Sequence, residues 1–376
     1  MDAPRILISA GEPSGDLHGA GVARALRRHW PDARLYGFGG SLMRAAGVEL
    51  KAHVDDLAVM GFAEVARHLP FFLRLLREVR RSLDRDPPDL VIPIDYPGFN
   101  LRLARMAKER AVPVLYYIAP QVWAWHSSRV ADLVRHTDRL AVILPFEESL
   151  FRAAGARASF VGHPLLDAAA PHAERAAFCN AVEIDPARPI LALFPGSRAQ
   201  EVRRHLALFE GAAAQVQARR PEVQPVIATG PAVPEALYHA SRYPRTSDSS
   251  ALLAHAAAAL AKSGTTTLQA AVAGTPLVVA YRMHALSYAI ARRVVEVEHV
   301  GLVNLVAGER LAPEFIQHEA TPDALAAALL PLLADGPERS RMRTGLARVR
   351  AALAGPEGED AAERVADLAA ELLAER

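Results

Sequence analysis

The stretch RILISAGEPSGDLHGAGVARALRRHW, residues 5–30, contains an apolar run, a glycine-containing turn and a helical pattern, in that order. The run RILISA is typical of a buried strand, and ARALRRHW is typical of an amphipathic helix. The same alternation recurs at DLVIPID followed by NLRLARMAKER, and at VPVLYYIA followed by SSRVADLVRH. Buried strands that alternate with amphipathic helices indicate βαβ units around a parallel sheet. The first half of the chain is therefore predicted to be an α/β, doubly wound domain.

The alternation lapses into a polar, alanine-rich segment after residue 167 and then restarts. Four further apolar runs each lead into a helical pattern: PILALF, QPVIAT, AAAALAKS and PLVVAYR. A chain of 376 residues is also long for one hydrophobic core. We expect two α/β domains, over residues 1–165 and 166–355, followed by a C-terminal helix at about 356–376.

The composition excludes several classes of protein. The 43 Lys and Arg residues stand against 42 Asp and Glu, so no global field indicates nucleic acid. Only Lys51, Lys108 and Lys262 are lysines, which we attribute to genome composition. The single cysteine, Cys179, excludes an intrachain disulfide framework and fits a reducing compartment. We see no secretory signal and no apolar run of membrane-spanning length, and expect a cytoplasmic protein that at most lies on a membrane surface.

The turn GEPSGDLHG, residues 11–19, raises the question of a phosphate site. A glycine-rich turn between a strand and a helix often binds phosphate, but Glu12 and Asp16 would repel a diphosphate. Neither this turn nor GFGGSLMRAAG carries the dinucleotide pattern GxGxxG, and no Walker A, HExxH or GxSxG sequence occurs. The carboxylates suit a polyhydroxyl substrate instead, with Glu12, Ser14 and Asp16 as candidates for orienting hydroxyls. Asp16 is also a candidate cap for the following helix.

The segment IDYPGFN, residues 94–100, places a carboxylate where a ligand is expected. Asp95 falls at the carboxyl end of the strand DLVIPID, which is where open parallel sheets bind ligands. Asp95 could take a proton from a substrate hydroxyl, and Asn100 opens the next helix. An ordinary turn-capping role for Asp95 is an equally good interpretation of this segment alone.

Two strand-to-helix turns in the second half are candidate anion sites. PGSRAQEV, residues 195–202, combines free N–H groups at a helix start with the charge of Arg198. KSGTTTLQAAVAGTP, residues 262–276, repeats this arrangement with Gly264 and three hydroxyl groups. Two such turns in one domain suggest a diphosphate ligand.

The helical segment at 65–83 has an apolar stripe wider than a core contact requires, opposite a face of arginines. An interfacial contact with anionic lipid is one interpretation, and a well-buried domain helix is the other. The candidate membrane-contact residues are Leu69, Phe71, Phe72, Leu73, Leu75 and Leu76.

Further motifs add to these segments: DLAVMGFAEV, QVWAWHSSRV, LPFE, FVGHPLLD, SGTTTLQ, YRMHALSY and LVNLVAGE. Together with the turns above, and in this order, they resemble the lipid-A-disaccharide synthase family from about residue 5 to about residue 350. The resemblance implies the GT-B architecture, in which two Rossmann-like domains face each other across a cleft and the C-terminal helix crosses back to the first domain. It also implies transfer of 2,3-diacylglucosamine from UDP to 2,3-diacylglucosamine 1-phosphate, with release of UDP.

The resemblance assigns roles to residues on both sides of that cleft. Asp95 is implied as the base for the acceptor 6-hydroxyl, with Glu12, Ser14, Asp16 and Asn100 on the acceptor side. The UDP-sugar side comprises Arg198, Ser263, Gly264, Thr265, Thr266, Gln269, Tyr281, Arg282 and Asn304. No metal and no other cofactor is expected, because the UDP-sugar is a substrate.

The implied partners are UDP-diacylglucosamine, acylated glucosamine 1-phosphate and the inner face of the cytoplasmic membrane, with no nucleic acid. A homodimer is compatible with the sequence. The helix at 70–83 corresponds to the family's membrane-associating element, which favours the interfacial interpretation.

Three positions depart from the family pattern. Gln269 stands where proteins of this fold commonly have a ribose-binding Glu, His126 stands where Arg is usual, and Val303 replaces a proline. These departures keep two alternatives open, a UDP-sugar epimerase of related fold and a nucleotide-sugar or lipid-binding homologue with altered catalysis. The lipid-facing helix and IDYPGFN argue against the epimerase.

Overall fold

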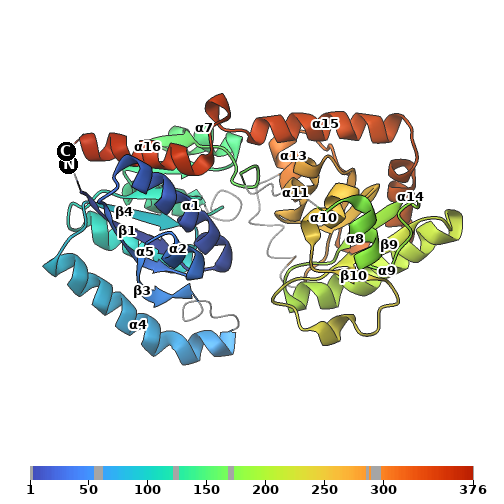
Figure 1. Ribbon diagram of the computed structural model, residues 1–376, viewed down its shortest axis with the longest axis horizontal. Helices are drawn as coiled ribbons and strands as arrows, with labels where there is room; N and C mark the ends of the chain where they lie inside the picture. The colour runs from blue at the N-terminus through green and yellow to red at the C-terminus, as the bar shows by residue number, and fades with distance from the viewer. Residues whose placement is uncertain are drawn as a thin grey trace. The chain divides into compact units, whose positions relative to one another are not determined.

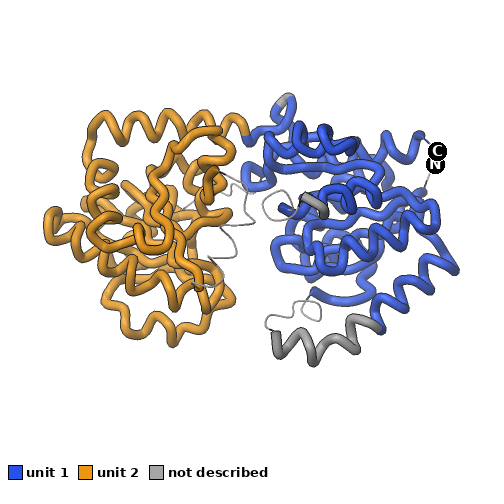
Figure 2. The backbone as a smooth tube through the Cα atoms, turned by 180° about the vertical axis from the view of Figure 1, so that it is seen from behind, with its two compact units in different colours: residues 1–167, 353–376 blue, residues 168–352 orange. Residues whose placement is uncertain are grey.

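The computed structural model describes residues 3–54, 62–121, 127–167, 173–284, 288 and 298–375, except for the side chains of 62–73, 127–129 and 357. The chain divides into two compact units (Figure 2). Unit 1 comprises Met1–Asp167 and Leu353–Arg376, and unit 2 comprises Ala168–Ala352. Each unit contains a parallel sheet with helices, which confirms the predicted α/β class.

Unit 1 is built on a seven-stranded parallel sheet in the order β3-β2-β1-β4-β5-β6-β7. Figure 1 labels β1, β3 and β4 of this sheet. Its strands are β1 (Arg5–Ala10), β2 (Arg34–Gly39), β3 (Glu49–His53), β4 (Leu90–Ile94), β5 (Leu115–Tyr117), β6 (Arg139–Val142) and β7 (Ala158–Phe160). Ile6 of β1 pairs with Leu35 of β2 on one side and with Leu90 of β4 on the other. From β1 to β3 the chain adds strands on one side of β1, and from β4 onward it adds them on the other side. The position between β1 and β4 is therefore a topological switch point.

Helices cover both faces of this sheet. They are α1 (Pro13–His29), α2 (Ser41–Ala45), α4 (Phe62–Arg85), α5 (Pro97–Lys108), α6 (Ser127–Arg135), α7 (Pro145–Ala153) and α16 (Ala361–Ala374), with a short 3₁₀ turn η4 (Pro356–Gly358). Ile6 and Ile8 share a buried cluster with α1, α2 and α16. Leu7 shares another with α4 and α5, because successive strand residues point to opposite faces.

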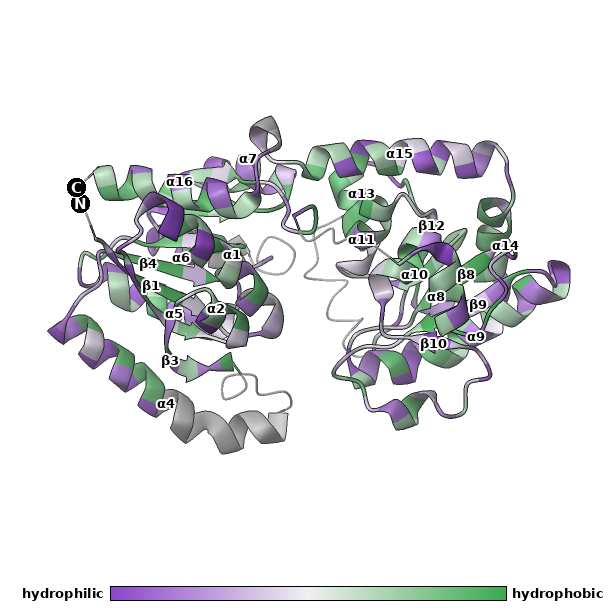
Figure 3. Cartoon of the chain, in the orientation of Figure 1, coloured by the Kyte–Doolittle hydropathy of each residue, from purple (hydrophilic) through white to green (hydrophobic). Residues whose placement is uncertain are grey.

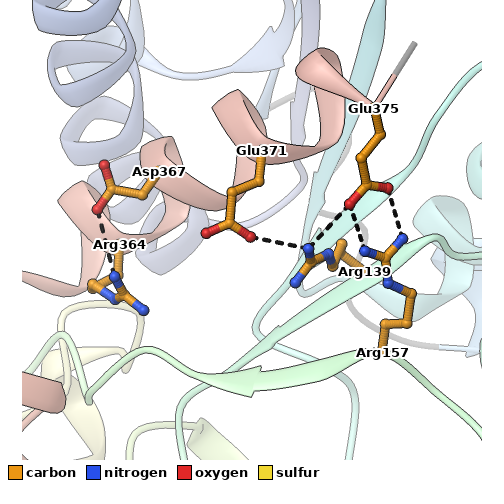
Figure 4. A network of polar contacts seen from close by, with 6 residues as sticks. All are labelled: Arg139, Arg157, Arg364, Asp367, Glu371 and Glu375. Carbon is orange, nitrogen blue, oxygen red and sulfur yellow. Dashed lines mark hydrogen bonds and ion pairs between the residues drawn. The ribbon is translucent and has the colours of Figure 1, made fainter.

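The C-terminal helix α16 belongs to unit 1, although the whole of unit 2 precedes it in the sequence. Its apolar face, which includes Val365, Leu368 and Leu372, is buried in the same cluster as β1. Two arginines pair with the C-terminal end of α16 (Figure 4). Glu375 lies 2.5 Å from Arg157, which precedes β7, and 3.3 Å from Arg139, which begins β6. Residues from the two ends of the chain therefore complete one core.

Unit 2 repeats the plan with a six-stranded parallel sheet in the order β10-β9-β8-β11-β12-β13. Its strands are β8 (Ile190–Phe194), β9 (Gln224–Ala228), β10 (Arg245–Thr246), β11 (Ala258–Lys262), β12 (Leu277–Tyr281) and β13 (Glu314–Ile316). The order reverses between β8 and β11, where Phe194 pairs with Ala261. This pair marks the switch point of unit 2.

The helices of unit 2 differ in how apolar they are. They are α8 (Arg175–Ala181), α9 (Ala199–Arg219), α10 (Ser249–His255), α11 (Thr266–Ala273), α13 (Leu302–Ala307), α14 (Pro322–Leu333) and α15 (Pro337–Leu353), with 3₁₀ turns η2 (Glu235–Tyr238) and η3 (Gln317–Glu319). The largely hydrophobic α14 packs against α9, β11 and β12, whereas α15 carries many polar residues (Figure 3). Helix α14 thus closes the core of unit 2 beside its central strands.

Candidate active site

Asp95 lies directly after β4, at the switch point of unit 1. Asp95 and Tyr96 both have left-handed backbone conformations, with φ angles of 46° and 47°. Such conformations cost on the order of 1–3 kcal/mol per residue and persist only where the surroundings enforce them. The carbonyl oxygen of Asp95 accepts hydrogen bonds from Tyr116 Oη at 2.7 Å and from Asn100 Nδ2 at 2.8 Å. These bonds hold the carboxyl group in a fixed, strained turn.

Asn100 holds this turn from inside the unit and does not reach a substrate. Its side chain is 0% exposed. Its Nδ2 also donates to the carbonyls of Ile94 and Ser9, and its Oδ1 accepts from Ser9 Oγ at 2.6 Å. This differs from the expectation that Asn100 binds the acceptor, because each polar atom of the amide already has a protein partner. Asn100 is a positioning residue.

The carboxyl group of Asp95 has a raised proton affinity. Burial raises the pKa of Asp95 to about 6, the charge of Glu12 adds to the rise, and the N–H of Tyr96 offsets part of it. Glu12 is itself exposed and lies at the N-terminal end of α1, with Ser14 in the first turn. Glu12 and Ser14 are therefore accessible at the same sheet edge as Asp95.

Gly11 lets the turns after β1 and β4 approach each other. A Cβ atom at this position would overlap the ring of Tyr96, so a larger residue would displace that ring. A glycine in such a turn can also let the backbone approach a bound sugar. The structure gives Gly11 a different contact, with an aromatic side chain next to Asp95.

Asp16 is occupied by backbone groups. Its carboxylate accepts hydrogen bonds from the N–H groups of Gly40, Leu42 and Met43 at 2.7, 3.0 and 2.9 Å, and it is 6% exposed. It thus caps the N-terminal end of α2. It does not cap α1, because Asp16 lies inside that helix, whose N-cap residue is Glu12. The expectation that Asp16 orients a substrate hydroxyl is not met, because three backbone donors already bind the carboxylate.

In the first anion turn of unit 2, PGSRAQEV, a carboxylate of the same turn binds the backbone N–H groups. Glu201 Oε2 accepts hydrogen bonds from the N–H groups of Ser197 at 3.0 Å and Arg198 at 3.3 Å. These N–H groups were predicted to be free, but the carboxylate of the third residue of α9 binds them. The Arg198 guanidinium is 57% exposed and lies 3.7 Å from Glu201 Oε1, so its side chain can still reach a ligand.

The second anion turn is more open. Gly264 has a φ angle of 151°, Thr265 is the N-cap residue of α11, and Thr266 begins the helix after the carboxyl end of β11. Ser263 differs from the expectation, because its hydroxyl donates to the carbonyl of Val300 at 2.7 Å and is largely buried. Gln269 is half-buried, and its amide has no hydrogen-bond partner within the part of the chain that the structure describes.

Three further candidates of unit 2 lie around β12 and α13. Tyr281 is half-buried, with the ring of His205 stacked at a centroid distance of 6.3 Å. The Arg282 guanidinium donates to the carbonyls of Gln317 and Ala320, at 3.2 and 2.6 Å. Asn304 is 0% exposed and bonds to Ala312 and Glu314. Asn304 therefore cannot line the UDP-sugar directly, which departs from the expectation. Arg282 is half-buried, and its contact with the UDP-sugar stays a prediction.

A cavity of about 410 Å³ that the sequence analysis did not predict opens at the carboxyl ends of β9 and β10. Thr229, Tyr238 and Thr246 are among its lining residues. A Cβ atom on Gly230, another lining residue, would lie 3.1 Å from Ser197, so the cavity adjoins the PGSR turn. No motif marks it, because its lining comes from the loop after β9 and the two-residue strand β10, which carry no characteristic pattern.

The membrane-contact candidates give a mixed outcome. Leu75 is 6% exposed and Leu76 is partly buried, and both pack in the cluster between α4 and α5. Leu75 therefore faces the core and not solvent. The side chains of Leu69, Phe71, Phe72 and Leu73 lie outside the described residues. None of the helices in the described ranges has the length and apolar character needed to cross a membrane.

One departure from the family pattern has a structural reason. Val303 is fully buried, and its N–H donates to Thr267 Oγ1 at 3.3 Å, a bond that a proline could not make. His126 lies outside the described residues.

Two parallel, doubly wound sheets in one chain, each with its candidate ligand turns at a switch point, are the architecture of the GT-B fold class. The calicheamicin glycosyltransferase CalG4 has this fold, with a TM-score of 0.64 at 21% identity, covering 100% of this chain and 99% of CalG4. A UDP-GlcNAc 2-epimerase from Neisseria meningitidis also matches, with a TM-score of 0.62 at 10% identity over 99% of this chain and 100% of the epimerase. At such identities the likeness shows the fold alone, and it does not separate transferase from epimerase.

The sequence comparisons do separate them. The family model described as Lipid-A-disaccharide synthetase matches residues 6–367. Lipid-A-disaccharide synthase from Acidobacterium capsulatum is 43% identical over 391 residues, covering 100% of this chain and 98% of that protein. The corresponding protein from Syntrophus aciditrophicus is 42% identical and covers 99% of both chains. The chain belongs to the lipid-A-disaccharide synthetase family, which confirms the predicted resemblance and does not favour the epimerase.

Proposed function

We propose that this chain is an inverting glycosyltransferase that transfers 2,3-diacylglucosamine from UDP to 2,3-diacylglucosamine 1-phosphate. The products are the β-1′,6-linked disaccharide 1-phosphate and UDP. Family membership over residues 6–367 supports the reaction. The observation that carries the mechanism is the strained turn after β4, which holds Asp95 at the switch point with a pKa of about 6.

In the proposed mechanism, Asp95 acts as the general base. Its carboxylate takes the proton of the acceptor 6-hydroxyl while that oxygen attacks C1 of the donor sugar. The bond from C1 to the diphosphate breaks, and the electron pair leaves with UDP, so a single displacement inverts the configuration. A base with a pKa near 6 is ionised at neutral pH and still accepts a proton readily, which suits this role.

On the acceptor side, we propose that Glu12 and Ser14 bind sugar hydroxyls. Both are exposed at the sheet edge that holds Asp95, and Glu12 is close enough to raise its pKa. Asp16 and Asn100 act indirectly, since their side chains hold the backbone of neighbouring turns.

On the donor side, we propose that the diphosphate binds at the turn Gly264–Thr265–Thr266, with Arg198 and Tyr281 around it. The cavity beside Ser197 has room for the nucleoside. Gln269 would bind the ribose, because its amide makes no hydrogen bond to another described residue. A neutral amide is a weaker partner for hydroxyls than a carboxylate, so we expect a reduced contribution there.

The test is a transfer assay with purified protein, UDP-diacylglucosamine and the acylated sugar phosphate. Formation of disaccharide and UDP in the presence of EDTA would support a transferase that needs no divalent metal. If activity appears only after a metal is added, the proposed transfer reaction stands, and the proposal that it needs no divalent metal is contradicted. UDP binding without product would favour the second candidate, a nucleotide-sugar-binding homologue with altered catalysis, which Gln269 motivates.

We also propose peripheral association with the cytoplasmic membrane, since both substrates carry acyl chains. The pattern of α4 supports this, although Leu75 is excluded from the contact by its burial. Flotation of the protein with vesicles that contain anionic lipid, compared with neutral vesicles, tests it. The same preparation tests the proposed homodimer by its mass in solution.

A further inference from the structure

Lys262 is the last residue of β11, at the switch point of unit 2 and next to the turn that opens α11. It is one of three lysines in a chain with 43 Lys and Arg residues. Its Nζ lies 2.9 Å from Glu201 Oε1 and would lie 3.7 Å from a Cβ atom built on Gly264. The ammonium group therefore lies beside the residue of the turn that has no side chain, Gly264.

The two anion turns of unit 2 differ in the state of their backbone donors. The N–H groups of Ser197 and Arg198 are bound by Glu201. In contrast, the N–H groups of Thr265 and Thr266 donate to no acceptor within the described part of the chain. Free N–H groups at the start of α11 favour an anion there. The open turn is thus the one with a lysine beside it.

The ammonium group is held between two other side chains. Glu201 lies on one side, and the ring centroid of Tyr281 lies 5.4 Å from Nζ. His205 stacks on Tyr281, and its Nε2 accepts a hydrogen bond from the N–H of Arg282 at 2.9 Å. The side chains of Lys262 and Glu201 are each 17% exposed, so this arrangement is largely shielded. A shielded, pre-positioned charge interacts more strongly with a ligand than a freely moving surface lysine does.

The ion pair leaves Lys262 with unused donors. Burial alone would raise the pKa of Glu201, but the hydrogen bond and the charge of Lys262 bring it below its ordinary value, so Glu201 is ionised at neutral pH. An ammonium group has three donors, and Glu201 is its single ionic partner among the described residues. Two donors can therefore bind further oxygen atoms.

We propose that Lys262 binds the diphosphate of the UDP-sugar and neutralises the charge that develops on UDP as it leaves. Glu201 is the positioning residue that holds Lys262 beside the turn. The inference rests on the proposed function, because the ligand is the donor of that reaction. In the transfer step, the bond between C1 and the diphosphate oxygen breaks, its electron pair stays on that oxygen, and Lys262 stabilises the oxygen without giving up a proton.

The choice of lysine fits this position. A guanidinium is planar and much wider than an ammonium group, and it would have to fit between Glu201, Tyr281 and Gly264. A compact charge can stay paired with Glu201 and still face the turn.

The test is calorimetric titration of Lys262→Ala with UDP, UMP and uridine, beside the unmodified chain. We expect Lys262→Ala to bind UDP about 10- to 100-fold more weakly, because one charge-assisted hydrogen bond is lost. UMP should lose less affinity, and uridine should bind unchanged. Glu201→Gln should also weaken UDP binding more than UMP binding and leave uridine binding unchanged. Its losses should be smaller than those of Lys262→Ala, since Lys262 remains. Lys262→Arg should not restore the affinity fully.

Lys108→Ala is the matched control, because Lys108 makes a comparable ion pair, with Asp138 at 2.6 Å, in unit 1. It should leave the affinity for UDP unchanged. Unaltered UDP affinity in Lys262→Ala, or an equal loss for UDP and uridine, would overturn the proposal and leave Lys262 as part of a structural ion pair. If the unmodified chain binds no UDP, the proposed function fails as well. If the unmodified chain binds UDP and the Lys262 variants bind it with the same affinity, the proposed function stands and this inference fails.

Discussion

At the scale of single residues, the site separates groups that touch substrate from groups that hold them. Asp95 is strained and partly buried, and its backbone is fixed by Asn100 and Tyr116. Asp16, Asn100 and Asn304 looked like binding residues in the sequence, because polar side chains at strand ends are typical of ligand sites. Each is instead buried and bonded to the protein. Motif position indicates the location of a site, but only the contacts distinguish a ligand group from its support.

Asp95→Asn should lose most turnover and keep UDP binding. We expect a decrease in kcat of about 10²- to 10⁴-fold, because an amide cannot accept the proton of the acceptor. The kcat/KM of the unmodified chain should fall as the pH drops below about 6, since protonation removes the base. Turnover and nucleotide affinity measured on the same preparations check both points. An asparagine variant with normal turnover would remove Asp95 from the role of base.

Gly11→Ala should disturb the site through Tyr96. The added Cβ would overlap the Tyr96 ring, and overpacking of this kind typically costs about 1–3 kcal/mol of unfolding free energy. Turnover should fall with it, because Tyr96 adjoins Asp95. Gly98→Ala is the matched control, since a Cβ there meets no atom within 4 Å. Urea unfolding and the transfer assay distinguish the two variants; equal behaviour would refute the packing argument.

At the scale of elements, β1, β4 and β8 in the middle of their sheets are predictable from the sequence, whereas the edge strands β3 and β10 are not. β1, β4 and β8 read as apolar runs because helices cover both of their faces. β3 has the sequence ELKAH and is half exposed at the edge of its sheet, so it lacks that signal. β10 has only two residues. The positions of the ligand turns follow from the central strands. The cavity at β9 and β10 depends on β10, which is too short for the hydrophobic pattern to predict.

A pair of carboxyl groups links the loop after β7 to the start of α16. Asp167 shares a hydrogen bond with Asp360, and both accept from the first N–H groups of α16, those of Ala361 and Ala362. Burial and the charge of Asp360 raise the pKa of Asp167 to about 6. The folded state therefore holds a proton that the unfolded chain has already released at that pH. Its stabilising contribution is complete below about pH 4 and is lost as the pH rises through 6.

Asp167→Asn should remove this dependence. The amide can donate to Asp360 and accept from Ala361 at every pH, so the variant should be more stable than the unmodified chain at pH 7.5. The gain should stay below about 1 kcal/mol, because solvent screens this exposed carboxyl group. Near pH 4 the two proteins should be equally stable. Thermal unfolding from pH 4 to 8 checks this, and a constant difference across the range would contradict it.

At the scale of the whole molecule, the chain order makes unit 1 depend on residues that follow the whole of unit 2 in the sequence. Helix α16 buries Val365, Leu368, Leu372 and Leu373 against the sheet formed by residues 5–160. Burial of each leucine or valine contributes roughly 1.5–3 kcal/mol. The sum is comparable to the total stability of a typical domain, which is about 5–15 kcal/mol. The acidic last turn adds surface ion pairs, which contribute much less.

Truncation after Ala354 should therefore unfold unit 1 and spare unit 2. Unit 2 ends at Ala352 and keeps its own core, so its amides should remain protected from hydrogen exchange while those of β1 and β4 lose protection. The truncated chain should also retain the UDP affinity that we assign to unit 2, and have no transferase activity. Glu371→Gln is the control, because it removes one exposed contact with Arg139 and leaves the apolar face of α16 intact. Loss of protection in both units, or protection of unit 1 without α16, would contradict the assignment of this helix to the core of unit 1.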